Sequence, residues 1–159
     1  MLKRIDFSLL LSYCSLIYYL SNQPVIKVPM FFTHQDKLHH FGAYFLMGIL
    51  AWRCSASLNN AAIIRFFLTF GFCSIYGASD EWHQSFVPGR ESDIWDWSAD
   101  AAGALSAAIW LLLINNRQLN LKRRQAGLKA GFDVARKQKS MKDGFERVAA
   151  DLKNFLKPF

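Results

Sequence analysis

Four apolar segments separated by polar stretches dominate the first 115 residues of the chain. They are residues 5–20, 41–52, 61–76 and 99–114. A helix that crosses about 30 Å of hydrocarbon needs about 20 largely apolar residues, so the second and fourth segments are extended to 38–54 and 95–114. We therefore expect an all-α protein, an integral membrane four-helix bundle. A soluble bundle with very apolar core helices is the alternative, and the basic tail that follows fits it less well.

The net charge of +7 is unevenly distributed. Residues 1–115 hold seven Lys/Arg against eight Asp/Glu, a net of −1, whereas residues 116–159 hold twelve against four, a net of +8. We therefore expect a four-helix transmembrane domain over 1–115 and a basic cytoplasmic tail over 116–159. Apolar positions with helical spacing predict that the tail is an amphipathic helix or partly disordered. It carries no recognition motif for nucleic acid, so we expect membrane lipids as its partner.

The basic residues also predict an orientation. Lys3 and Arg4 precede the first apolar segment, Arg53 and Arg65 flank the connection between the second and third, and the tail is basic. Loops 21–37 and 77–94 are neutral or acidic. An excess of Lys/Arg on the cytoplasmic side predicts a multi-pass protein of the inner (cytoplasmic) membrane with both termini in the cytoplasm. No small-residue cleavage site follows the first segment, which indicates an uncleaved membrane helix.

Ionisable residues gather at the predicted outer ends of the second, third and fourth segments. Their placement is informative because charges near a bilayer are costly. Helical spacing puts three sets of these residues on shared helix faces. The sets are Asp36 with His40, Asp80 with Gln84, and Asp96 with Asp100 and Gly103. We expect the three faces to form one pocket.

Two stretches of these residues resemble the signatures of a known family. Asp36-Lys37-x-x-His40-Phe41, followed by Tyr44, resembles the first signature of the VanZ-like membrane proteins. Glu81-x-x-Gln84-x-Phe86-Val87-Pro88-Gly89-Arg90, then Asp96 and Gly103, resembles the second. The resemblance covers roughly residues 5–115. It implies a membrane protein of the cell envelope, in a family named after a low-level glycopeptide (teicoplanin) resistance determinant. Asp100 departs from the family pattern, which usually has asparagine there.

One hypothesis is an outward-facing site that binds or modifies an envelope lipid or glycan, such as a lipid-linked precursor, or binds a glycopeptide. In it, His40 is a general acid/base or nucleophile oriented by Asp36. Lys37 and Arg90 hold an anionic headgroup, with Arg90 presented by the Pro88-Gly89 turn. Asp80, Glu81 and Asp96 complete the candidate catalytic group, orienting water or a divalent metal. Tyr44, Gln84 and Asp100 join Lys37 and Arg90 as candidate ligand-binding residues.

Two other hypotheses stay open. His39, His40, His83 and nearby carboxylates could ligate Zn²⁺ or Mn²⁺, but the sequence lacks a tight His-x-x-x-His or Glu-x-x-His pair, so we assign no metal ligands and no cofactor. A non-enzymatic scaffold or partner-binding protein is the other alternative. Its polar cluster would be structural, because polar side chains also hold membrane helices together. The sequence does not decide whether the chain is an enzyme.

Overall fold

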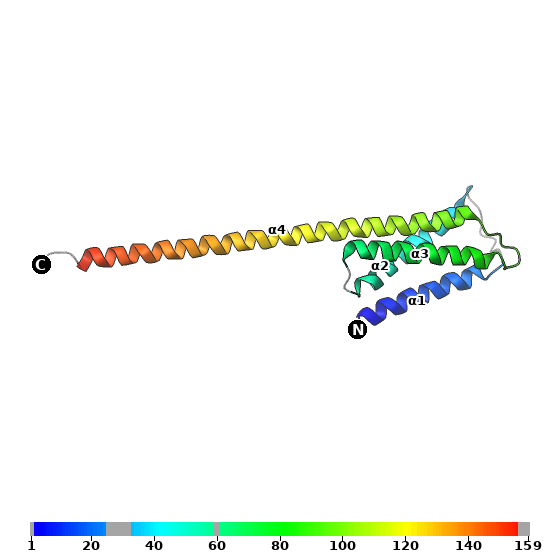
Figure 1. Cartoon of the computed structure of the whole chain (residues 1–159), viewed down its shortest axis with the longest axis horizontal. Helices are drawn as coiled ribbons and strands as arrows, with labels where there is room; N and C mark the ends of the chain where they lie inside the picture. Colours follow the sequence, from blue (N-terminus) through cyan, green and yellow to red (C-terminus); the bar gives the residue numbers. More distant parts are fainter. Residues whose placement is uncertain (1, 25–32, 59–60, 156–159) are drawn as a thin grey trace. The chain divides into compact units, whose positions relative to one another are not determined.

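The computed structural model describes residues 2–24, 33–58 and 61–155, with side chains from 4 to 149 (Figure 1). Within these residues the secondary structure is helical throughout, without strands, which confirms the all-α prediction. The helices are α1 (Leu2–Ser21), α2 (Gln35–Ala56), α3 (Ala62–Gln84) and α4 (Ile94–Phe155). Residues 25–32, in the middle of the predicted loop 21–37, lie outside the described part of the chain.

Two helices extend beyond the predicted segments. Helix α3 continues to Gln84, so Asp80 and Gln84 lie on one helix face at its end, as predicted, and the connection to α4 is short. Helix α4 runs from the fourth apolar segment into the basic tail without interruption. The reason is that neither junction contains a helix-breaking residue: the first proline after α3 begins is Pro88, and the tail up to Leu156 is rich in Ala, Leu, Lys, Arg and Gln.

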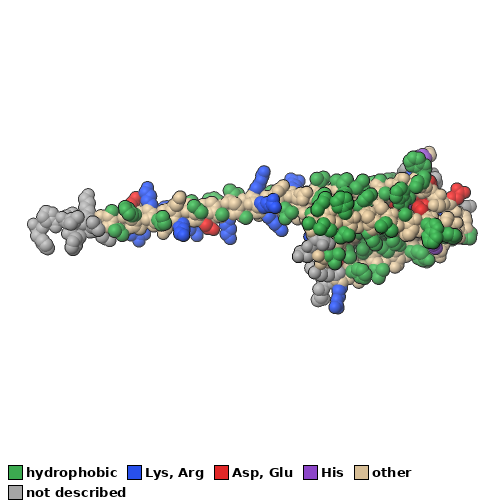
Figure 2. All heavy atoms as spheres, in the orientation of Figure 1, with side chains coloured by type: hydrophobic (Ala, Val, Ile, Leu, Met, Phe, Trp, Pro, Cys, Tyr) green, Lys and Arg blue, Asp and Glu red, His purple; other side chains and the backbone are tan. Residues whose placement is uncertain are grey.

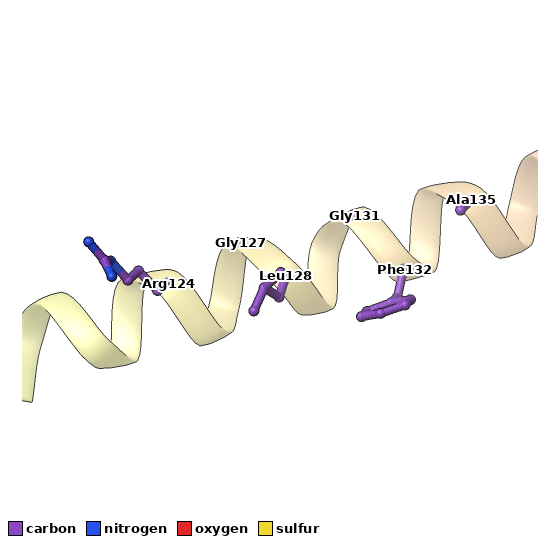
Figure 3. Close-up of a pocket in the computed structure, with 6 residues that line it drawn as sticks. All are labelled: Arg124, Gly127, Leu128, Gly131, Phe132 and Ala135. Carbon is purple, nitrogen blue, oxygen red and sulfur yellow. The ribbon is translucent and has the colours of Figure 1, made fainter.

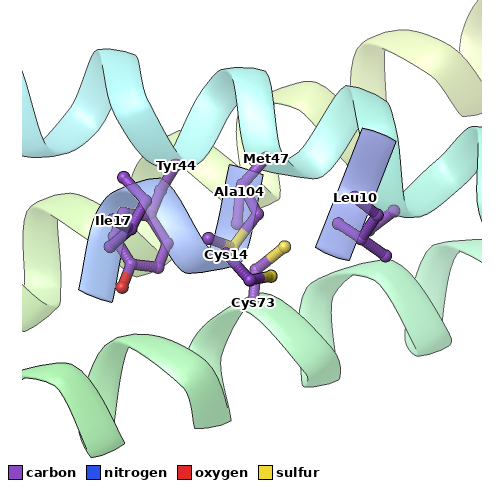
Figure 4. Close-up of a cluster of buried hydrophobic side chains, with 8 residues drawn as sticks. Leu10, Cys14, Ile17, Tyr44, Met47, Cys73 and Ala104 are labelled. Atoms are coloured by element: carbon purple, nitrogen blue, oxygen red, sulfur yellow. The ribbon is translucent and has the colours of Figure 1, made fainter. Parts of the chain in front are cut away.

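The chain divides into two compact units, Met1–Asn116 and Arg117–Phe159. The core of the first unit lies between its four helices (Figure 4). Each helix contributes side chains to it, and the buried members are Leu10, Cys14, Ile17, Tyr44, Met47, Ala51, Cys73 and Ala104. A single cluster shared by four helices makes the described part of the first unit one helical bundle.

Small residues allow α2 and α4 to pack closely. A Cβ added to Gly103 of α4 would collide with the carbonyl oxygen of Phe41, so the backbones of the two helices nearly touch at that point. One turn further along, a Cβ on Gly48 would lie 2.9 Å from the Cβ of Ala107. Small residues are the usual means by which membrane helices approach one another. This close packing brings the first turns of α2 and α4 together, where the polar residues lie.

Hydrophobic side chains cover much of the face of the bundle that Figure 2 shows. Among the described residues, two helices, α3 and α4, are long and apolar enough to cross a membrane. Only 17% of the most apolar stretch of α3 and 28% of that of α4 is buried, whereas the core helix of a soluble protein is mostly buried. The exposed residues of α3 include Phe67 and Ile75, at 63% and 73% exposure. That α1 and α2 also cross the membrane stays a prediction.

The second unit is the helical tail. Its Lys and Arg side chains project along the helix between apolar ones (Figure 2). Leu128 and Phe132 project from the same side, next to Gly127 and Gly131, where they border a shallow hollow (Figure 3). Both apolar side chains are well exposed. Over the described residues 117–155 the tail is therefore a helix with basic and apolar positions interleaved.

Candidate functional site

The candidate site lies where α1 and α3 end and α2 and α4 begin. Hydrogen bonds between residues far apart in the sequence establish this arrangement: Ser21 of α1 bonds to Asp80 of α3, and Lys37 of α2 bonds to Asp96 of α4. The opposite end of the bundle holds a separate ion pair, in which Arg53 donates to Asp6 at 2.7 and 3.0 Å. All the predicted site residues except Tyr44 are therefore at one end of the helices.

Lys37 is the centre of one polar group. Its Nζ lies 2.5 Å from Asp93 Oδ2, 2.7 Å from Asp96 Oδ1 and 3.1 Å from Asp36 Oδ2. One ammonium thus joins the first turn of α2 to the α3–α4 connection and the first turn of α4. Its three donors match three carboxylates, so Lys37 is engaged within the protein.

Within this group, the Lys37 ammonium and the carboxylates that it contacts shift one another's pKa values. The hydrogen bond from Lys37 is the main reason that the pKa of Asp93 lies below its usual value. Partial burial raises the pKa of Asp36, but the hydrogen bonds to Lys37 outweigh it and the net pKa is lowered. Burial likewise lowers the pKa of Lys37, and its bonds to Asp93, Asp96 and Asp36 raise it well above the ordinary lysine value. Lys37, Asp93 and Asp36 therefore stay charged at neutral pH.

A second polar group joins α1 to α3. Asp80 Oδ2 accepts hydrogen bonds from Ser21 Oγ at 2.8 Å and from Gln84 Nε2 at 3.1 Å. The bond between Asp80 and Gln84 follows the i, i+4 spacing that placed them on one helix face. All three residues are buried. Ser21, which ends α1, was not among the predicted site residues, since a serine after an apolar run carries no distinct signal.

Arg90 closes this second group. It lies on a tight turn in which its backbone N–H donates to Val87 O at 3.0 Å and Gly89 has φ +81°. Proline followed by a glycine with positive φ is the pattern of a type II turn. From the turn, the guanidinium donates to the carbonyls of Leu20 at 3.0 Å and Gln23 at 3.2 Å. Arg90 therefore caps the carboxyl end of α1, where a cation is favoured.

His40 and Asp100 form a third contact, between α2 and α4. His40 Nδ1 lies 3.0 Å from Asp100 Oδ1, and His40 Nε2 lies 3.9 Å from Asp96 Oδ1. Asp100 is fully buried, and its other oxygen, Oδ2, has no hydrogen-bond partner. Gly77 makes room for it, because a Cβ there would lie 3.1 Å from that oxygen. The carboxylates beside His40 are thus those of Asp100 and Asp96, whereas Asp36 contacts Lys37.

Glu81 links α3 to the start of α4. Its Oε2 accepts a hydrogen bond from the backbone N–H of Asp93 at 2.9 Å, and Asp93 Oδ1 accepts one from the N–H of Trp95 at 2.9 Å. Asp93 therefore caps α4, and Glu81 holds the cap in position. The other oxygen of Glu81, Oε1, is buried and has no hydrogen-bond partner. Together with Asp100 Oδ2, it is an acceptor that the protein leaves unused.

A cavity of about 180 Å³ opens beside these groups. One part of its wall is polar and the other is apolar. The polar part is lined by Ser21, His39, His40, Asp80, Gln84 and Arg90, and the remainder by Ile17, Leu20, Ala43 and Tyr44. The hydroxyl of Tyr44 is buried and has no hydrogen-bond partner. Five of the predicted site residues therefore share one cavity, while Asp36, Lys37 and Asp96 form the neighbouring ion-pair cluster.

Comparisons with known proteins agree with this picture. The family model described as VanZ/LLP1 matches residues 5–115, the same part of the chain over which the two sequence signatures predict a VanZ-like domain. Neither the search of curated proteins nor that of solved structures gave a match. The family match therefore covers the helical bundle and the candidate site, and it ends where the tail begins.

Proposed function

The chain belongs to the VanZ/LLP1 family, and we propose that it is a multi-pass inner-membrane protein whose outward-facing polar site binds the headgroup of an envelope lipid or its glycan. The observation that carries the proposal is the cavity with one polar and one apolar wall. Such a cavity suits an amphiphile, whose headgroup would meet His40 and Gln84 while its chain lies against Ile17 and Leu20. A few polar groups in an apolar pocket are the usual form of a ligand site.

The orientation rests on the distribution of charge. The cavity lies at the end of the bundle formed by the α3–α4 connection, and the opposite end carries Arg53 and leads into the basic tail. Lys and Arg favour the cytoplasmic side, so the cavity end faces outward. The test is labelling by a membrane-impermeant maleimide in intact cells, after the three native cysteines are replaced. We expect Ser92→Cys to be labelled and Gly127→Cys to be protected, and the reverse pattern would refute this orientation.

The charges of the site favour a ligand rich in hydroxyl or amine groups. Lys37 and Arg90, which the sequence offered for an anionic headgroup, are engaged by carboxylates and by helix carbonyls. The polar groups that line the cavity include the Ser21 hydroxyl, the Gln84 amide and the Asp80 carboxylate. Carboxylate oxygens accept hydrogen bonds, and they repel a bare phosphate. A glycan headgroup is therefore the better candidate.

The same site has the elements of acid–base chemistry. His40 lines the cavity, and Asp100 holds its Nδ1 at 3.0 Å. A carboxylate on one ring nitrogen orients the imidazole and leaves the other nitrogen free to exchange a proton with a bound ligand. His40 is thus placed to take part in modification of the bound headgroup. The cavity by itself supports binding.

A structural role is the second candidate for the Lys37 and Arg90 groups. Each of these cations joins separate elements of the bundle: Lys37 joins α2 to α4, and Arg90 joins the turn after α3 to α1. Buried polar contacts of this kind hold membrane helices together. Under this alternative the chain is a scaffold or partner-binding protein, and removing either cation lowers stability without affecting any ligand.

Binding of purified protein tests the ligand. The full chain in detergent is titrated with three probes: a lipid-linked glycan, the corresponding lipid phosphate without sugar, and the free glycan. We expect the lipid-linked glycan to bind most tightly, and His40→Gln to weaken it at least about tenfold, or about 1.4 kcal/mol. The control is His34→Asn, because His34 has φ +66°, which Asn tolerates, and does not line the cavity. Equal affinity for the three probes, or equal loss in both variants, would refute the proposal.

A role in glycopeptide resistance follows from the family name and needs its own test. Cells lacking the protein are complemented with the wild type, His40→Gln or His34→Asn at equal membrane abundance. We expect the wild type and His34→Asn to restore glycopeptide tolerance and His40→Gln to fail. If the deletion leaves susceptibility unchanged, the site serves another envelope function.

A further inference from the structure

We propose that His40, Glu81 and Asp100 bind a divalent transition-metal ion. The three residues come from α2, α3 and α4, and their ligand atoms all lie within 4.8 Å of one another. No two of them are close in the sequence, so only the packing of the helices assembles the group. One imidazole with two carboxylates is a donor set that suits Zn²⁺ and Mn²⁺.

The unused oxygens point independently to a cation. Glu81 is 95% buried and Asp100 fully buried, and each has one oxygen that lacks a hydrogen-bond partner. A buried carboxylate without compensation is strongly unfavourable. The nearest lysine does not supply it, because Lys37 contacts Asp36, Asp93 and Asp96. A divalent ion between the two carboxylates would satisfy both.

The distances fit an ion with six ligands. Neighbouring ligands on an octahedral ion with bonds of about 2.1 Å are about 3 Å apart. His40 Nδ1 and Asp100 Oδ1 are separated by 3.0 Å, and an ion bound by both atoms would replace the hydrogen bond between them. Opposite ligands on such an ion are about 4.2 Å apart by the same bond length. The three ligand atoms lie within 4.8 Å of one another, so the farthest pair would need to move only slightly closer for all three to bind one ion. This spacing favours Mn²⁺, and a tetrahedral Zn²⁺ would require the pair to separate slightly.

The ion would have access to the cavity, because His40 lines it. Three protein ligands leave coordination positions open for water or for an oxygen of a ligand. Its function would be to bind such an oxygen, whether it belongs to a sugar or to a phosphate.

Metal binding is measured directly on the full-length protein in detergent. After removal of metal by a chelator, the protein is dialysed against Mn²⁺ or Zn²⁺ separately, and bound metal is counted by mass spectrometry. We expect about one ion per chain and a higher melting temperature, since a ligand that binds only the folded state stabilises it. We expect Asp100→Asn and Glu81→Gln each to reduce affinity at least about tenfold. The control Glu91→Gln removes an exposed carboxylate of the α3–α4 connection and should bind as the wild type does.

The outcomes separate this proposal from that on lipid binding. Less than about a tenth of an ion per chain for both metals in folded wild-type protein would overturn it, whatever the lipid result. So would undiminished binding by Asp100→Asn and Glu81→Gln. If Asp100→Asn does not fold, the wild-type stoichiometry and Glu81→Gln decide the question. No lipid is present in the assay, so its result does not depend on the proposed function.

Discussion

His40 Nδ1 and Asp100 Oδ1 lie 3.0 Å apart although 60 positions separate the two residues in the sequence. His40 is in the second turn of α2 and Asp100 in the second turn of α4. Their contact depends on the close approach of these helices at Gly103 and Phe41. The site chemistry is therefore coupled to helix packing, and variants can be chosen to affect one or the other.

Gly103→Ala tests the packing of α2 against α4. The added methyl group would collide with the backbone of Phe41, which cannot move without shifting α2. We expect a loss of about 1–3 kcal/mol in the free energy of unfolding, the usual cost of overpacking. Reversible denaturation in mixed detergent micelles measures it. Gly42→Ala is the matched control, because no atom lies within 4 Å of its Cβ position, and a control loss as large as that of Gly103→Ala would contradict the packing argument.

Arg90→Ala removes the cap of α1. The carbonyls of Leu20 and Gln23 at the end of α1 lose the guanidinium as a donor, and so does the amide oxygen of Gln84 at 3.5 Å. We expect lower membrane abundance and a lower melting temperature. Both should recover in part in Arg90→Lys, since lysine keeps the positive charge but lacks the planar guanidinium with its several N–H donors. Arg136→Ala, in the exposed tail, is the control. Normal stability of Arg90→Ala combined with lost function would instead place Arg90 in a ligand site.

The Lys37 cluster predicts a pH dependence. Lys37 lowers the pKa of Asp93 and Asp36, so the folded state binds fewer protons at these carboxylates than the unfolded state. Their contribution to stability is present above the unfolded pKa of about 4 and is lost as the pH falls through the lower folded values. We expect Lys37→Met to have a lower melting temperature than the wild type at pH 7. The difference should shrink as the pH falls below 4.

Melting temperatures of the two proteins from pH 3 to pH 8, at constant ionic strength, test this prediction. Lys137→Met, in the exposed tail, controls for the loss of one positive charge. A difference between Lys37→Met and the wild type that stays constant with pH would mean that the ammonium stabilises the bundle by packing alone.

Tyr44→Phe separates a binding role from a structural one. The Tyr44 ring is almost fully buried in the core, and its hydroxyl has no partner in the protein. Removing a buried hydroxyl that makes no hydrogen bond costs little or stabilises. We expect unchanged or raised thermal stability together with weaker binding of the lipid-linked glycan. A clear loss of stability would mean that the hydroxyl has an internal partner, and unchanged binding would exclude it from the ligand site.

Much of the architecture follows from the sequence. Long apolar segments between polar stretches are enough to predict four helices, because a helix satisfies its own backbone hydrogen bonds and needs only its length and its residue types. The identity of the polar residues also follows, since charges close to apolar helices are rare and therefore noticeable. The end of α3 near Gln84 was predicted from its polar residues, whereas α4 continues far beyond its apolar segment, because helix formation does not stop where polarity begins.

Spacing predicted the contact of Asp80 with Gln84 within α3, but the contacts of polar residues between helices were decided by the tertiary structure. Spacing along one helix paired His40 with Asp36, yet the packed bundle places His40 beside Asp100 and leaves Asp36 to Lys37. Lys37 and Arg90 looked suited to an anion, and both are engaged inside the protein. The physical reason is that periodicity determines which residues share a helix face, whereas contacts between faces depend on the rotation and approach of neighbouring helices. Those are determined by small residues such as Gly103 and Gly77, which carry no chemical signal of their own.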